Sequence, residues 1–109
     1  LPGFKQRKRA LAARYIELFD GMANVEFCVE PQGTESIYWL NAILLSDDAE
    51  REIFLDQANA AKIGARPCWT MMHELQVYKD RPRAGDLAGA AEISARLVNI
   101  PSTVTLMGC

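Results

Sequence analysis

The chain has 109 residues, of which 50% are hydrophobic and 24% are charged, and its formal net charge at pH 7 is −2. This length holds one domain with a hydrophobic core and is too short for two. The charge gives no general attraction to nucleic acid or to an anionic membrane, and no apolar run reaches the roughly 18 to 20 residues of a membrane span. We therefore expect one soluble globular domain with neither of these partners.

The three cysteines, Cys28, Cys68 and Cys109, form no C-x-x-C pair. Because their number is odd and no secretory signal is present, we expect reduced thiols in the cytoplasm. No two ligands among these cysteines and His73 have a short metal-binding spacing, so no metal site is expected. The first residues, LPGF, contain no initiator methionine, and we expect that they lie partway through a longer protein.

Residues 4–22 are predicted to form a helix. Leu11, Tyr15 and Leu18 recur at i, i+4 and i+7 and form one apolar stripe, after which Gly21 suits a helix end. The first half of this helix carries the basic residues Lys5, Arg7, Lys8, Arg9 and Arg14. A phosphate- or nucleic-acid-binding patch is one interpretation. A solvated helix face is favoured, because no aromatic residues for base stacking are interleaved with these cations.

Two strands are predicted next. Residues 24–30 alternate between apolar and polar side chains. Residues 36–45 are largely apolar in both alternating sets, so this strand is expected to be covered on both faces. Asn41 is the exception in that run, and a buried amide is costly unless it is hydrogen-bonded. A bridge from this side chain to neighbouring backbone is favoured over contact with a ligand.

A second helix is predicted from the capping residues 46–48 to about residue 62. Its buried stripe is expected to contain Phe54, Ala58 and Ala61. Gly64 is expected to allow the following turn. Residues 65–67 are predicted to add a short strand at an edge of the sheet, because Pro67 has no N–H to donate.

Residues 80–85, DRPRAG, are predicted to form a loop. Asp86 is then a suitable N-cap for a third helix that runs to about residue 97. One face of this helix is expected to carry Leu87, Ala90, Ala91, Ser94 and Leu97. Residues 98–100 are predicted to form a last short strand, and residues 102–109 to be frayed.

The predicted order of elements is thus α-β-β-α-β-α-β, in which the two adjacent strands can pair as a hairpin. This order favours an α+β fold: a small two-layer sandwich of about three helices on a mostly antiparallel sheet. Residues 63–78, IGARPCWTMMHELQVY, stand out because they are aromatic, sulfur-rich and apolar where a connector is usually polar. We expect this segment to lie against another surface.

Four segments together resemble the C-terminal domain of the DegT/DnrJ/StrS family of sugar aminotransferases, which are pyridoxal-phosphate enzymes of the aspartate-aminotransferase fold. The segment LPGFKQRKRALAARYIELF resembles the long helix that leads from the family's large domain into its small one. The segment YWLNAILL resembles the central strand of the small domain. IGARPCWTMMHELQVY resembles the family's segment of a Gly, an Arg-Pro pair, an aromatic residue, a His and a Tyr, and ARLVNIPS its closing helix and strand.

The resemblance implies that the chain is the C-terminal part of a longer aminotransferase, with residues 1–22 as the linking helix and residues 23–109 as the α+β small domain. The complete enzyme is then expected to be a cytoplasmic homodimer that binds pyridoxal phosphate. Its expected substrates are an amino donor and a nucleotide-linked keto sugar used in surface glycan biosynthesis. A free-standing α+β binding or regulatory module is the alternative.

The family's Schiff-base lysine, its pyridine-facing aspartate and its phosphate-binding residues belong to the large domain. None of the four lysines of this chain, Lys5, Lys8, Lys62 and Lys79, lies in a pocket-forming segment that would activate it as a nucleophile. We therefore expect no catalytic residue and no bound cofactor in this chain by itself.

Through the resemblance, Arg66, Trp69 and His73 are the candidate substrate-binding residues. Arg66 offers a fork of donors for phosphate or carboxylate, Trp69 a flat apolar face, and His73 a donor or acceptor near neutral pH. If Trp69 and His73 lie on one helical turn, their i, i+4 spacing places them on one face. Core roles for Trp69 and His73 remain open alternatives at this point.

Overall fold

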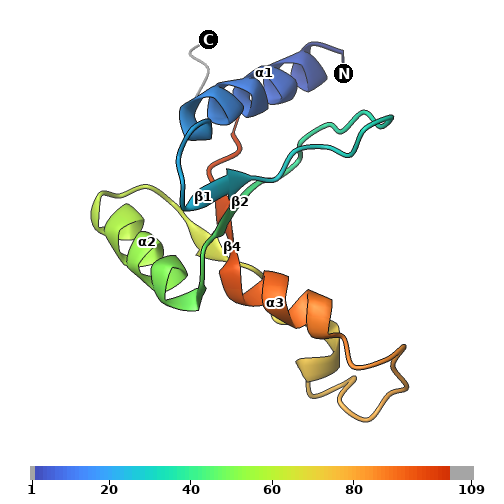
Figure 1. Cartoon of the computed structure of the whole chain (residues 1–109). Helices are drawn as coiled ribbons and strands as arrows, with labels where there is room; N and C mark the ends of the chain where they lie inside the picture. The colour runs from blue at the N-terminus through green and yellow to red at the C-terminus, as the bar shows by residue number, and fades with distance from the viewer. Residues whose placement is uncertain (1, 104–109) are drawn as a thin grey trace.

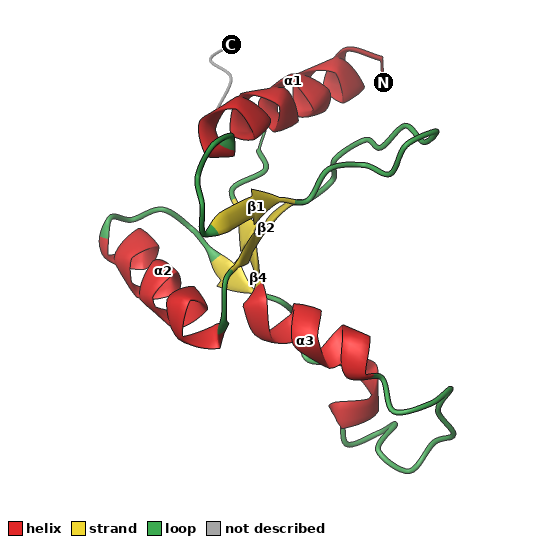
Figure 2. Cartoon of the chain, in the orientation of Figure 1, coloured by secondary structure: helices red, strands yellow, loops and turns green. Residues whose placement is uncertain are grey.

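The computed structural model describes residues 2–103, which form three helices, a short 3-10 helix (η1) and a four-stranded sheet (Figures 1 and 2). In chain order the elements are α1 (Pro2–Phe19), β1 (Val25–Phe27), β2 (Asn41–Leu45), α2 (Asp48–Ala60), β3 (Arg66–Pro67), η1 (Met72–Glu74), α3 (Ala88–Arg96) and β4 (Leu97–Ile100). The predicted order of helices and strands is confirmed, with η1 as an addition. No helix within residues 2–103 is both long and apolar enough to cross a bilayer.

The strands lie in the order β1-β2-β4-β3, and every neighbouring pair is antiparallel. The predicted hairpin of the first two strands is confirmed, and so is the α+β class. β3 lies at an edge of the sheet, as expected from Pro67, which cannot donate to a further strand. The central pair, β2 and β4, brings Ile43 opposite Val98, and both side chains are fully buried.

The core lies on one face of the sheet. Register places Phe27, Ile43 and Val98 side by side, and residues opposite each other on neighbouring strands point to the same face. The buried cluster adds Ala12 of α1 and Leu55 of α2. Along β2 the buried residues alternate with half-buried ones, so the prediction that this strand is covered on both faces holds fully for one face and partly for the other.

The strand predicted for residues 36–45 begins only at Asn41, because Tyr38 interrupts it. Tyr38 has a positive φ of 48°, which ends the extended alternation, and its side chain turns into the core, where 7% of it is exposed. The backbone N–H of Glu30 donates to the Tyr38 hydroxyl at 3.0 Å, and the Arg9 guanidinium lies 5.7 Å from the ring centroid. Residues 28–40 therefore form a long loop that extends alongside α1 (Figure 1).

α1 packs on the sheet through its middle. Leu11 and Ala12 are buried, and the Tyr15 ring lies 6.1 Å from that of Phe27. Leu18, predicted on the same stripe, is 58% exposed, whereas its neighbour Phe19 packs against the core. The predicted end of the helix is close to the observed one, and Gly21 follows it with a φ of 81°.

α2 begins as predicted, because the Asp47 carboxylate accepts a hydrogen bond from the N–H of Glu50 at 2.8 Å. Its buried face differs from the prediction in three residues. Leu55 and Ala58 are buried, whereas Phe54 is half-buried and Ala61 is exposed. The helix ends before Ala61, so that residue no longer faces the sheet.

The turn after α2 was expected at Gly64 and is instead made by Lys62, whose φ is 64°. The N–H of Lys62 donates to the carbonyl of Asn59 at 3.0 Å, and the N–H of Ile63 donates to that of Ala58 at 2.8 Å. These two bonds form a Schellman motif with a lysine at the position that glycine usually occupies.

α3 begins at Ala88, so Asp86 is not its N-cap. Leu87 has that position with a φ of 59°, and the Asp86 carboxylate accepts from the N–H of Ala88 at 3.1 Å. The face predicted for this helix loses Leu97, which already belongs to β4, and no residue of α3 is buried. The predicted tail lies mostly outside the described residues, since only Ser102 and Thr103 of it are placed.

Candidate functional site

Three of the five basic residues of α1 bind other parts of the chain itself. Lys8 is buried, and its ammonium donates to the carbonyl of Trp39 at 3.1 Å and to that of Ser102 at 2.6 Å. Arg9 forms a two-pronged ion pair with Glu30, at 2.9 Å for both bonds, and also donates to the carbonyl of Ser36. The favoured interpretation as a solvated face is therefore wrong for these two residues.

The same pairing sets the charge state of Glu30. Hydrogen bonds from Arg9, and then from the N–H of Ser36, lower the pKa of Glu30 to about 2. In return, the hydrogen bond to Glu30 raises the pKa of Arg9. A second ion pair joins Lys5 to Glu35. These contacts attach the 28–40 loop to α1 and give Lys5, Lys8 and Arg9 partners within the chain, whereas Arg7 and Arg14 are exposed.

Asn41 lies where the loop enters the sheet, and it is fully buried. Its backbone N–H donates to the Ser102 hydroxyl at 2.9 Å, and its side-chain amide donates to the same oxygen at 3.3 Å. The hydroxyl in turn donates to the carbonyl of Ile100. The predicted bridge from this side chain to neighbouring backbone thus runs through a serine hydroxyl. The Asn41 Oδ1 has no hydrogen-bond partner among residues 2–103.

Arg66, the first candidate substrate-binding residue, lies on β3 and is exposed. Its Nη1 donates to the Asn59 side chain at 3.3 Å and to the carbonyl of Ala65 at 3.0 Å. Both acceptors are neutral. The guanidinium is therefore oriented without being neutralised, which leaves its charge available to an anion.

Trp69, the second candidate, follows β3 and is 69% exposed. The core alternative for this residue is wrong within the described chain. Its ring lies 6.5 Å from that of Trp39, with an angle of 71° between the planes. Trp39 is 62% exposed and was not predicted as a site residue. In the sequence it looked like one more apolar residue of a buried strand, and only the turn at Tyr38 places it outside.

His73, the third candidate, is half-buried on η1. Its carbonyl accepts a bond of 3.4 Å from Arg83. Trp69 precedes η1, and Met71 before this helix is extended, so Trp69 and His73 do not share one helical turn. Among the described residues, no hydrogen bond, ion pair or ring contact joins Arg66, Trp69 and His73 to one another.

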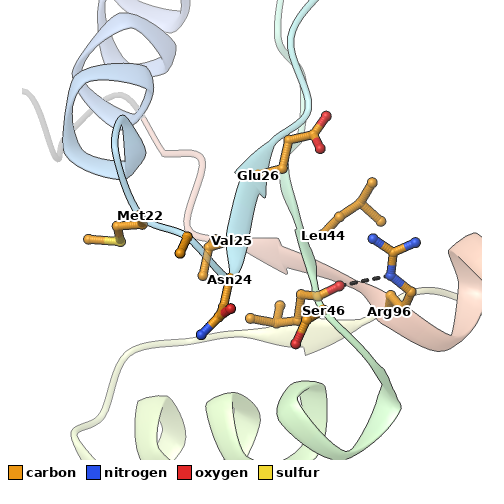
Figure 3. Close-up of a pocket in the computed structure, with 9 residues that line it drawn as sticks. Met22, Asn24, Val25, Glu26, Leu44, Ser46 and Arg96 are labelled. Atoms are coloured by element: carbon orange, nitrogen blue, oxygen red, sulfur yellow. Dashed lines mark hydrogen bonds between the residues drawn. The ribbon is translucent and has the colours of Figure 1, made fainter.

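Three hollows can be described, and the three candidate residues line none of them. The hollow in Figure 3, of about 520 Å³, lies beside β1 and β2, where Arg96 Nε donates to the carbonyl of Leu45 at 2.8 Å. A second hollow, of about 260 Å³, also lies beside β1, which is an edge strand of the sheet. A third, apolar hollow of about 330 Å³ is lined by Phe4, Lys5, Lys8, Ile37 and Trp39.

Much of the segment predicted to lie against another surface is exposed in this chain. Its exposed large apolar residues are Ile63, Trp69, Met72, Leu75, Val77 and Tyr78. In Figure 1, η1 and the loop after it project beyond α3, away from the sheet. No element of residues 2–103 covers these side chains, and the surface expected for the segment stays a prediction.

None of the four lysines has surroundings, within the described residues, that would activate it as a nucleophile. Lys5 is paired with Glu35, and Lys8 is occupied by two carbonyls. Lys62 is exposed at a helix end and Lys79 is exposed in a loop. The described residues thus do not fit pyridoxal phosphate as a covalently held group.

The part of the chain that the structure describes contains neither a cluster of metal ligands nor a disulfide bond. No group of three metal-ligand side chains occurs within residues 2–103. Cys28 and Cys68 are free and half-buried, and burial, with a smaller contribution from Glu26, raises the pKa of Cys28. Cys109 lies outside the described residues.

This arrangement of helices and antiparallel strands is found in solved aminotransferases. It superposes on the aminotransferase TlmJ from Streptoalloteichus hindustanus with a TM-score of 0.80 at 20% identity, and on DesV of S. venezuelae, in complex with a ketimine intermediate, with 0.81 at 20%. The match covers 94% of this chain and 27% of each of those chains. Helicobacter pylori PseC, an aminotransferase of pseudoaminic acid biosynthesis, gives a TM-score of 0.80 at 16% identity over 94% of this chain and 28% of its own.

The model of the DegT/DnrJ/EryC1/StrS aminotransferase family matches residues 1–108. The chain therefore belongs to this family, and the resemblance seen in the sequence is confirmed. It spans little more than a quarter of the length of the solved structures it superposes on. A comparison with curated protein sequences found no match.

Proposed function

We propose that this chain is the C-terminal small domain of a pyridoxal-phosphate-dependent aminotransferase that acts on nucleotide-linked keto sugars for surface glycan biosynthesis. Residues 1–22 would link it to the large domain, and residues 23–109 would form the small domain. The observation that carries this proposal is the family match over residues 1–108 in a chain that covers only about a quarter of its structural neighbours. The complete enzyme would be a homodimer in the cytoplasm.

In the complete enzyme, pyridoxal phosphate would supply the electron sink of the amino transfer. Cofactor-bound structures occur among the neighbours: the putative sugar aminotransferase Spr1654 from Streptococcus pneumoniae, 19% identical, is described in its PLP form. The four lysines of this chain are paired, bound to carbonyls or exposed away from the three hollows described, which supports a cofactor site made by residues outside this chain.

The contribution of this chain would be to hold the substrate. Arg66 would bind an anionic group, which suits a sugar nucleotide because its diphosphate is negatively charged. Trp69 would provide a flat apolar face, and His73 a hydrogen bond. The exposure of Arg66 and Trp69 and the neutral partners of Arg66 support this assignment. The half-buried His73 is the least accessible of the three.

The test is a kinetic comparison in the complete enzyme. Losing a hydrogen bond to a charged group costs about 1.5 to 3 kcal/mol, or roughly ten- to a hundredfold in binding. We expect Arg66→Ala and His73→Ala to raise the KM for a nucleotide-linked keto sugar by such factors, while the half-reaction with the amino donor stays unchanged. Arg81→Ala, in an exposed loop of the same chain, is the matched control. A lower thermal midpoint with equal loss in both half-reactions would assign the residue to the core instead.

A further inference from the structure

Trp39 and Trp69 are the only two tryptophans of the chain, and they form one exposed pair. Their centroid separation of 6.5 Å and interplanar angle of 71° define an edge-to-face contact, the arrangement that the charge distribution of aromatic rings favours. With 62% and 69% of their surfaces exposed, neither ring is needed to fill the core. The pair therefore presents flat apolar surface to whatever approaches this side of the chain.

The position of Trp39 is fixed by buried groups around its backbone. Tyr38 precedes it in a left-handed conformation, which bulky residues adopt only when their surroundings enforce it. Lys8, itself buried, donates to the carbonyl of Trp39, and the fully buried Asn41 follows two residues later. The main chain is thus held tightly, while the indole is left in solvent.

An apolar hollow adjoins the Trp39 side chain. The hollow of about 330 Å³ beside it is lined almost entirely by apolar atoms of Phe4, Ile37, Trp39 and the stems of Lys5 and Lys8. A backbone held so firmly, an exposed ring and an adjoining apolar hollow together indicate a surface that receives a ligand or holds a ligand-binding residue in place.

We propose that Trp39 is a positioning residue for the substrate of the complete enzyme. Its edge-to-face contact holds the Trp69 ring in one orientation, so that the open face of Trp69 stacks on a ring of the sugar nucleotide. This inference rests on the proposed function, because it takes Trp69 as a substrate contact. Trp39 acts through Trp69 and takes no part in the chemistry.

The test uses the complete enzyme with UDP-linked and GDP-linked 4-keto-6-deoxy sugars as probes. Trp39→Leu keeps an apolar side chain but removes the aromatic edge, and we expect the KM for the sugar nucleotide to rise about three- to tenfold. The half-reaction with the amino donor should not change. Trp39→Phe should restore the KM to within about twofold, since it keeps an aromatic edge. Val29→Ala, equally exposed on the same loop, is the control.

A double-mutant cycle separates the two proposals. If Trp39 acts through Trp69, the variant with both residues changed to Leu should be no worse than Trp69→Leu alone. A raised KM in Trp69→Leu with a normal KM in Trp39→Leu would overturn this inference and leave the proposed function intact. A normal KM in Trp69→Leu would contradict the proposed site and this inference with it. Additive effects, or equal loss in both half-reactions, would also overturn the role given to Trp39.

Competition identifies the ring that stacks on Trp69. Inhibition by UDP and by glucose 1-phosphate is measured in the wild type and in Trp39→Leu. Weaker inhibition by UDP assigns the stacked ring to the base, and weaker inhibition by glucose 1-phosphate assigns it to the sugar. Unchanged inhibition by both compounds would count against stacking.

Discussion

Two regions of this molecule contradict the usual relation between residue type and burial. The α1–sheet junction, made by Lys8, Tyr38, Asn41 and Ser102, is polar and largely buried. The protruding segment, residues 68–87, carries Trp69, Met72 and Val77 and is largely exposed. The junction can be buried because nearly every polar group there has a partner. The protruding segment is exposed because no element of residues 2–103 covers it.

The contrast separates the polar contacts that stabilise this fold from the apolar surface that the fold leaves exposed. Lys5, Lys8 and Arg9, for which a solvated helix face was expected, hold a loop against α1. Apolar residues that suggested a buried segment are left available, and apolar surface of this kind often marks an interaction site. Substitutions among the buried groups should therefore lower the free energy of unfolding, whereas substitutions in the protruding segment should barely change it.

The largest difference is expected between a core residue and a protruding one. Ile43 is fully buried, so Ile43→Ala should lower the free energy of unfolding by about 2 to 5 kcal/mol through lost contacts and a cavity. Val77 is 73% exposed, and Val77→Ala should change this quantity by no more than about 0.5 kcal/mol. Urea denaturation of both variants measures the difference. Equal losses would show that the protruding segment is part of the cooperative core.

A smaller but still clear effect is expected at Lys8. Lys8→Met keeps the apolar stem and removes the ammonium, which leaves the carbonyls of Trp39 and Ser102 without this donor. The free energy of unfolding should fall by about 1.5 to 3 kcal/mol. Arg7→Met, at the exposed neighbouring position, is the control and should be near neutral. If the two variants are equally stable, the junction does not depend on this lysine.

Acid should weaken the attachment of the 28–40 loop. The pKa of Glu30 is about 2 in the folded chain, below its ordinary value of 4.5, so its contribution is complete above 4.5 and is lost as the pH falls toward 2. We expect Glu30→Gln to lower the thermal midpoint at pH 7 and to approach the wild-type midpoint near pH 2. Glu17→Gln, on the exposed side of α1, serves as the reference. A constant offset between Glu30→Gln and wild type across this range would argue against the ion pair as its cause.

The smallest effect is expected at the end of α2. Lys62 occupies a left-handed position, so Lys62→Gly should raise the free energy of unfolding by about 0.5 to 1 kcal/mol by relieving that conformation. Ala61→Gly, where φ is −82°, should lower it instead. Thermal unfolding of both variants measures the sign of each change in stability. A loss of stability in Lys62→Gly would mean that the lysine side chain stabilises the fold by more than its left-handed backbone costs.

The sequence predicted the order of elements well, because apolar periodicity and capping residues act locally. Asp47 caps α2 as expected, and Pro67 lies at the sheet edge. The turns were predicted less well. Tyr38, Lys62 and Leu87 adopt left-handed conformations in which glycine is more usual, so composition did not reveal them.

The site was predicted only in part, since contacts between distant segments decide it. The identity of Arg66, Trp69 and His73 came from the family resemblance, and their role stays a prediction. Trp39 could not be recognised beforehand, because its exposure depends on the turn at Tyr38 and its contact with Trp69 joins two separate segments. The partners of Lys8 lie 31 and 94 residues away, beyond any local pattern.

Hydroxyl-radical footprinting tests most directly whether the protruding segment faces the rest of a larger enzyme. Trp69 and Met72 should be labelled quickly in the 109-residue chain, where they are 69% and 62% exposed, and more slowly in the complete enzyme. Phe27, buried in the sheet, should remain protected in both. Equal labelling of Trp69 and Met72 in the two proteins would contradict the proposed small domain and would favour a free-standing binding module.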